Sequence, residues 1–337
     1  MHRQNRTARR ALVAAAAAAL LLGTAGALPA AAAPDRAPAV IAGHAPGLVP
    51  ESAVWDQSHH RFLVGSLGHG TVSAVGTDGS VRTLVDDPGT LIEIAGLRID
   101  PVHRRILVTN LDNGLGDRTG SATYGRTAGL GAYDLDTGRR LFYVDLAAVA
   151  ADGGSHLAND IAVGPDGTAY VTDSFAPIVY RVHPDGTAAV LLRDQRLAAP
   201  TGSYGLNGIA YREGLLVLGT WDDGTLWQLP PHDPAGLRRI EVTGADALLH
   251  LDGILGRPDG SLAGVTNALY GTGRDAEVEL RSDDHWRTAR VTAVRPSADP
   301  VPTAVTAGPA GALYQLSGGL ADASAGHPTD TFALRRI

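Results

Sequence analysis

The chain has 337 residues, including 28 arginines, and contains neither lysine nor cysteine; its 35 acidic residues give it a formal net charge of −7. The lack of cysteine excludes disulfides, thiol nucleophiles and thiolate zinc sites, and the lack of lysine excludes Schiff-base chemistry. The negative charge argues against nucleic-acid and anionic-membrane partners. Few aromatic residues and abundant glycine, proline, valine and threonine favour an all-β fold.

The N-terminal segment has the pattern of a secretory signal peptide. Four arginines lie within the first ten residues, an uncharged apolar run follows, and small residues near Ala30 to Ala33 offer a cleavage site. We therefore expect a signal peptide over residues 1–32, a single domain over residues 33–337, and a secreted, extracellular product. Arg9 and Arg10 partly match a twin-arginine signal, so export by either the Sec or the Tat route stays open. No later run is long and apolar enough to predict a membrane span.

A strand-like template recurs six times along the chain. Its anchor residues are 44 to 50 positions apart, except for one interval of 64. The anchors are Glu51, Ala95, Asn159, Asn207, Asp252 and Pro302. This interval is typical of propeller blades, so we predict a six-bladed β-propeller with four-stranded antiparallel blades around a central channel. Six hairpins in a β-sandwich are the alternative, but a sandwich rarely repeats one template at so constant an interval.

The long interval contains an insertion in the second blade, Asn110 to Gly129, which is rich in glycine, threonine and asparagine. It either covers a site or forms a surface loop without function. Both ends of the domain are strand-like, around residues 39–43 and 329–337. We expect them to share one blade, because that arrangement removes an open sheet edge.

Four of the six anchors carry side-chain oxygens. In a propeller, the residue just ahead of each innermost strand lies at the channel mouth, so Glu51, Asn159, Asn207 and Asp252 should converge there. Two carboxylates and two carboxamides from four blades suit a hard divalent cation, and calcium is the first candidate. Taken singly, each of these residues is more often an ordinary turn residue that bonds to nearby backbone than a metal ligand.

Over residues 45–337, these motifs resemble the senescence-marker, gluconolactonase and LRE-like family of six-bladed propellers, with diisopropyl fluorophosphatase and paraoxonase as relatives. The resemblance implies that Glu51, Asn159, Asn207 and Asp252 bind the metal and that Asp252 also acts in catalysis, as base or as nucleophile. It thus implies a metal-dependent hydrolase of lactones or related esters. Ser52 and Ile161 depart from the family pattern beside the ligands, and Leu157 replaces a basic residue that recognises sugar lactones in some members.

A non-catalytic propeller that binds a ligand, as in the royal-jelly and yellow-type proteins, is the alternative function. In either case the expected partner is a small molecule and the expected state is a monomer. No Gly-x-Ser-x-Gly elbow and no P-loop is present in the sequence, so serine-esterase and nucleotide chemistry have no basis here.

Residues that end the second strand of each blade should also lie on the mouth face, because antiparallel neighbours return to the same end. The candidates for the pocket lining are His69, Asn110, Asp173, Trp221 and Asn267. Side chains alternate along an extended chain, so Asp160 cannot point the same way as Asn159 and should support its loop from behind. The pair His59 and His60 falls in a turn at the far end, where we expect no metal or catalytic role.

Overall fold

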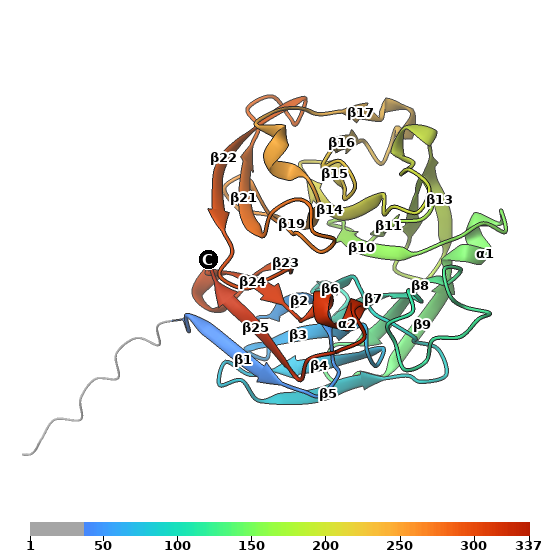
Figure 1. The fold of residues 1–337 in the computed structure, drawn as a ribbon. Coiled ribbons are helices and arrows are strands. Elements are labelled where there is room, and N and C mark those ends of the chain that lie inside the picture. Colours follow the sequence, from blue (N-terminus) through green and yellow to red (C-terminus); the bar gives the residue numbers. More distant parts are fainter. Residues whose placement is uncertain (1–36) are drawn as a thin grey trace, which may run out of the picture. The chain divides into compact units, whose positions relative to one another are not determined.

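Six antiparallel sheets surround a central channel in the computed structural model, which describes residues 37–337 (Figure 1). Blades 1 to 3 consist of β2 (Pro50–Asp56), β3 (Arg61–Ser66), β4 (Thr71–Val75), β5 (Val81–Asp86); β6 (Leu97–Asp100), β7 (Arg105–Leu111), β8 (Ala128–Asp134), β9 (Arg140–Asp145); and β10 (Ala158–Val163), β11 (Ala169–Asp173), β12 (Ile178–Val182), β13 (Ala188–Arg193). Each is numbered from the channel outwards. The six-bladed propeller predicted from the repeat is confirmed.

Blades 4 to 6 follow the same order. They consist of β14 (Leu206–Arg212), β15 (Leu215–Thr220), β16 (Leu226–Leu229), β17 (Arg238–Arg239); β19 (Leu251–Gly256), β20 (Leu262–Thr266), β21 (Ala276–Arg281), β22 (Thr288–Pro296); and β23 (Pro302–Ala307), β24 (Leu313–Ser317), β25 (Thr331–Arg336), β1 (Val40–His44). Blade 5 gains a fifth strand, because β18 (Glu241–Thr243) pairs in parallel with β22. The helical segments are α1 (Leu146–Ala150), α2 (Leu320–Ser324), and the 3₁₀ turns η1 (Gln195–Leu197), η2 (Pro234–Gly236), η3 (Ala245–Leu248) and η4 (Pro309–Gly311).

The two ends of the domain share blade 6, as predicted. Strand β1 pairs antiparallel with β25, from Val40 opposite Arg335 to His44 opposite Thr331. The hydroxyl of Tyr314 also donates to the carbonyl of Pro38 at 2.6 Å. This pairing joins the first and last blades and covers the edge that β25 would otherwise expose. The predicted signal peptide, residues 1–32, lies outside the described residues.

In the strands near the channel, apolar and polar residues alternate weakly because both faces of these strands are buried. Every residue of β7 and β11 is buried, because both faces of the second strands pack against neighbouring blades. Leu107 of blade 2 and Val171 and Tyr180 of blade 3 belong to one such inter-blade cluster. The outermost strands have one exposed face and alternate, as β1 does. Within residues 37–337, no helix is long and apolar enough to cross a membrane.

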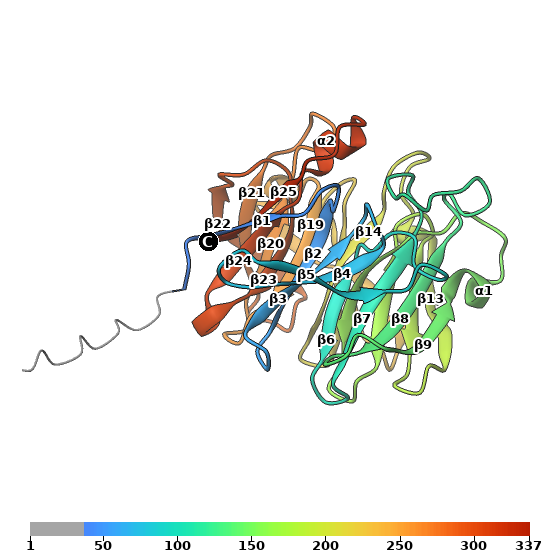
Figure 2. The same ribbon diagram turned by 90° about the horizontal axis from the view of Figure 1, so that it is seen from below.

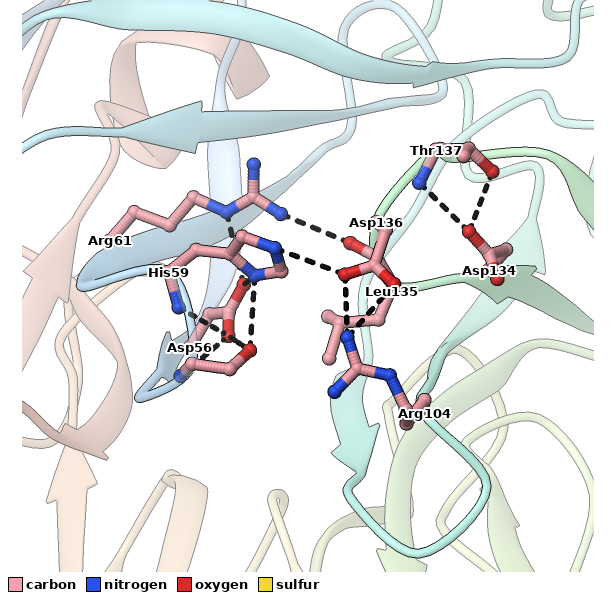
Figure 3. A network of polar contacts seen from close by, with 9 residues as sticks. Asp56, His59, Arg61, Arg104, Asp134, Leu135, Asp136 and Thr137 are labelled. Atoms are coloured by element: carbon pink, nitrogen blue, oxygen red, sulfur yellow. Dashed lines mark hydrogen bonds and ion pairs between the residues drawn. The ribbon is translucent and has the colours of Figure 1, made fainter.

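The turn between β2 and β3 lies at the end of the channel opposite Glu51, and a buried aspartate organises it (Figure 3). Asp56 accepts hydrogen bonds from the ring of His59 at 2.6 Å and from Arg61 Nε at 3.0 Å. His59 also contacts Asp136 of blade 2 at 3.0 Å. The histidine pair therefore sits in a turn far from the mouth, as expected, where His59 ties blade 1 to blade 2.

Blade 2 repeats this arrangement with Asp100, His103 and Arg105. Asp100 accepts from the ring of His103 at 2.8 Å and from Arg105 Nε at 3.0 Å, and Arg105 reaches the carbonyl of Gly167 in blade 3. Burial alone would raise the pKa of Asp100, but the bonds from His103 and Arg105 outweigh it and lower the pKa below its usual value. The pKa of Asp56 is lowered in the same way, by bonds from Ser58, Arg61 and His59 that outweigh burial.

We expect the protein to lose stability in acid because of these two aspartates. Their folded-state pKa values are depressed, so their stabilisation is complete above the ordinary aspartate pKa of about 3.9 and is lost as the pH falls below it. The free energy of unfolding should drop by about 1.4 kcal/mol per pH unit for each proton taken up. Urea unfolding at pH 7, 5 and 3 measures this. An unchanged free energy between pH 5 and pH 3 would contradict it.

Candidate functional site

The predicted anchors lie in β-bulges at one end of the inner strands. In blade 1, Pro50 pairs with Ser66 and Ser52 with Gly65, which leaves Glu51 as the extra residue. The register shifts at the same place in the pairs β10·β11, β14·β15 and β19·β20, at Asn159, Asn207 and Asp252. A bulge bends the strand and redirects a side chain, which lets these residues turn toward the channel mouth.

Blade 6 requires a correction to the repeat. Pro302 pairs with Ser317 and Ala304 with Leu316, so the extra residue is Thr303 and not the anchor Pro302 that the sequence pattern indicates. Pro302 instead corresponds to Pro50, the residue before the bulge in blade 1. The bulge cannot be seen in the sequence, and the repeat is therefore displaced by one position in this blade.

Hydrogen bonds between blades hold the bulges in place. Thr109 of β7 donates to the carbonyl of Asn159 at 2.8 Å, and Thr172 of β11 donates to that of Asn207 at 2.7 Å. Thr303 donates to the carbonyl of Glu51 at 2.6 Å and links blade 6 to blade 1. A threonine hydroxyl in one blade thus fixes the anchor carbonyl of the next.

Close packing between blades explains why glycine follows two of the anchors. A Cβ added to Gly208 would lie 2.4 Å from the carbonyl oxygen of Asp252, and one added to Gly253 would lie 2.8 Å from that of Thr303. The Asn-Gly and Asp-Gly pairs of the repeat therefore let the anchor backbone of the neighbouring blade approach closely.

All four predicted ligands border one pocket at the channel mouth. Asn159, Asn207 and Asp252 are buried, and Glu51 is half-buried. Helix α2 contributes Leu320 and Ser324 to the pocket and stands above the same face of the ring (Figure 2). The insertion contributes Asn113 and Leu115, so part of it borders the pocket.

Hydrogen bonding leaves oxygen atoms free at the base of this pocket. Asn159 Nδ2 donates to Ser174 Oγ at 3.0 Å, and its Oδ1 accepts no hydrogen bond from residues 37–337. Asn267 Nδ2 donates to Asp252 Oδ2 at 2.6 Å, while Asp252 Oδ1 is buried and has no partner in the described chain. An unpartnered buried carboxylate oxygen is costly, and a cation would satisfy it. The donor set thus fits a hard divalent cation.

The pKa shifts of Asp252 and Glu51 also favour a bound cation. Burial raises the pKa of Asp252 to about 7 against the lowering effect of the hydrogen bond from Asn267 and of the nearby Asn207 side chain, and the carboxylate of Asp160 adds to the rise. Burial, then Asp252 and Asp160, raise the pKa of Glu51, which Arg98 partly opposes. Carboxyl groups that are hard to ionise alone are stabilised as anions by a bound cation.

Asp160 lies beside these residues, but its oxygens are occupied. Its Oδ1 accepts from the amide of Ile161 at 2.8 Å, and its Oδ2 accepts from Arg98 at 3.0 Å and from the amide of Ile209 at 3.3 Å. Arg98, on inner strand β6, is a neighbour that the sequence repeat does not indicate, because nothing in blade 2 marks it as facing the channel. The described residues include no group of three or more His, Asp or Glu side chains arranged to hold a metal.

The five residues expected to line the pocket do not border it. Asn267 lies behind Asp252, and Asp173 bonds to His156 and to the backbone of Leu157. Asn110 binds the amide of Ile92, and His69 pairs with Asp117. Trp221 stacks on His250 with ring centroids 3.9 Å apart. The ends of the second strands are thus used to fasten the surrounding loops, and residues of those loops form the wall instead.

Solved structures of other propellers resemble this chain. The major allergen Mala s 1 of Malassezia sympodialis superposes with a TM-score of 0.69 at 17% identity, over 89% of this chain and 96% of that one. A gluconolactonase of Xanthomonas campestris gives 0.57 at 16% identity, over 85% and 86%. A luciferin-regenerating enzyme gives 0.58 at 12% identity, over 88% and 94%.

The chain has the fold of the family that its sequence resembles. Gluconolactonase and luciferin-regenerating enzyme are the two members among these neighbours that match it. No protein-family model matches the chain, and no curated protein matches it in sequence. The likeness is therefore one of fold, and the chemistry must be argued from the pocket.

Proposed function

We propose that the protein is a divalent-metal-dependent hydrolase of lactones or related esters, with calcium at the channel mouth. The observation that carries the proposal is the convergence of Glu51, Asn159, Asn207 and Asp252 on one pocket, with free oxygens on Asn159 and Asp252. The structural likeness to a gluconolactonase supports the reaction class. The segment 1–32 supports action outside the cell, which N-terminal sequencing of protein from the culture medium tests.

Each residue has a defined task in this proposal. Glu51, Asn159, Asn207 and Asp252 would hold the metal, which when bound supplies Lewis acidity toward a carbonyl oxygen. Asn267 keeps Asp252 oriented through its bond to Oδ2, which leaves Oδ1 without a donor among residues 37–337. Asp160 and Arg98 pair with each other beside the ligands and balance one carboxylate charge.

Asp252 has two possible parts in the hydrolysis. As a base, it would take a proton from water while the water oxygen adds to the carbonyl carbon, and would return that proton to the alkoxide when the ester C–O bond breaks. As a nucleophile, its carboxylate would form the new bond to the carbonyl carbon as the ester C–O bond breaks, and the released alkoxide would take a proton from water. The resulting hydroxide would then cleave the anhydride and restore the carboxylate. Both routes require an ionised carboxyl group at residue 252.

A panel of lactones and aryl esters, assayed with calcium and with EDTA, tests the proposal. We expect turnover of at least one class that EDTA abolishes and that added calcium restores. If the calcium-loaded protein turns over no substrate, the hydrolase proposal is contradicted and the binding propeller of the royal-jelly and yellow type is favoured.

A further inference from the structure

Leucine side chains form most of the wall above the four oxygen-bearing residues. They come from five of the six blades, so no single loop accounts for the apolar character of the wall. These leucines are Leu67, Leu111, Leu115, Leu157, Leu269 and Leu320. A ligand that reaches the base of the pocket must therefore pack against aliphatic surface on almost every side.

The polar groups of the wall are largely engaged with each other. Asn113 Nδ2 and the hydroxyl of Tyr204 lie 2.9 Å apart, and the same hydroxyl lies 3.1 Å from Asn113 Oδ1. This pair joins the blade 2 insertion to the loop that precedes β14. Besides this pair and the four anchors at the base, the lining contains two polar side-chain groups, Ser324 and the hydroxyl of Tyr270.

We propose that the pocket selects carbonyl compounds with a linear aliphatic chain and rejects polyhydroxylated lactones. The assignment of the carbonyl end to the polar base rests on the proposed function. The aliphatic part rests on the leucine wall. A sugar-acid lactone would place several hydroxyl groups against leucines, where they lose their bonds to water without replacement. An alkyl chain instead buries apolar surface along its length.

Each methylene added to the chain should tighten binding by about threefold to fourfold for as long as the chain lies against the leucine wall.

Binding of unreactive lactams to the calcium-loaded protein tests the selection without relying on turnover. We expect the Kd, measured by calorimetry, to fall by about threefold to fourfold for each methylene across a series of 6-alkyl-2-piperidinones. The δ-lactam of gluconic acid should bind at least about tenfold more weakly than the tightest member. A Kd that does not change along the series, or a sugar lactam that binds as tightly as the best alkyl lactam, would overturn the proposal.

Two variants of the leucine wall test where the alkyl chain binds. Leu115→Ser and Leu269→Ser should each weaken binding of the longest lactam by about tenfold and leave the shortest nearly unchanged, because both side chains are half-buried and border the pocket. Leu141→Ser is the matched control, because Leu141 is 43% exposed on the outer strand β9. If the control variant shows the same loss as the wall variants, the assignment of the wall is wrong.

Turnover of the corresponding lactones separates this inference from the proposed function. Chain-dependent binding without turnover would support the aliphatic selection and contradict the hydrolase. Turnover of sugar lactones with no turnover of alkyl lactones would support the hydrolase and contradict the selection.

Discussion

Replacing Asp252 with asparagine should lower kcat/KM for the best substrate by about 10² to 10⁴-fold and leave the fold intact. Both possible roles of Asp252, base and nucleophile, need an ionised carboxyl group, and a carboxamide can fill neither. The substitution preserves the shape of the side chain and one oxygen atom at the base of the pocket. It also removes a buried carboxyl group whose Oδ1 has no partner in the described chain, so little stability of the metal-free protein should be lost.

Asp78→Asn is the matched control for this variant. Asp78 is exposed in the turn between β4 and β5, at the end of blade 1 opposite the mouth. Steady-state kinetics and thermal unfolding of both variants give the comparison. If Asp252→Asn keeps the wild-type kcat/KM, the carboxyl group does not take part in the reaction, and the proposed mechanism is wrong.

Removal of the metal should lower the free energy of unfolding of the whole domain. A cation held by residues of blades 1, 3, 4 and 5 links distant parts of the chain and binds the folded state alone. Free calcium at a hundredfold excess over its Kd should therefore add about 2.7 kcal/mol to the free energy of unfolding. For a domain of this size, the Tm should rise by about 4 to 8 °C.

Thermal unfolding with calcium, with EDTA and with EDTA followed by excess calcium measures this effect. Magnesium serves as the control cation, because it prefers a tighter octahedral site and should stabilise less. If an EDTA-treated sample unfolds at the same temperature as a sample shown to contain metal, the proposal of a ligand set shared between blades is wrong.

The architecture could be predicted from the sequence because each blade repeats the same local requirements. The interval of the anchors sets the blade count, and the strand-like ends around residues 39–43 and 329–337 predict the closure that β1 and β25 provide. The anchors Glu51, Asn159, Asn207 and Asp252 could be found because a bulge places the same position of each repeat at the same end of the channel.

The lining of the pocket could not be predicted in the same way, because it depends on loops that the repeat does not share. Asn113 and Leu115 belong to the insertion, and Leu320 belongs to α2, which follows β24 in blade 6 alone. The residues expected there, such as Asn110 and Asp173, instead bind loop backbone behind the wall. Leu157 departs visibly from the family pattern, and it is a sequence signal of the apolar wall that the structure shows.

Calcium titration by calorimetry of Asn159→Ala and Asp160→Gly tests the central claim most directly, because the two residues are adjacent and differ in their contacts. Asn159 Oδ1 accepts no hydrogen bond from the described part of the chain, whereas both oxygens of Asp160 accept hydrogen bonds. The account predicts that Asn159→Ala loses calcium binding and that Asp160→Gly keeps it, weakened by no more than about ten- to a hundredfold. Loss of calcium in Asp160→Gly together with retention in Asn159→Ala would contradict the account.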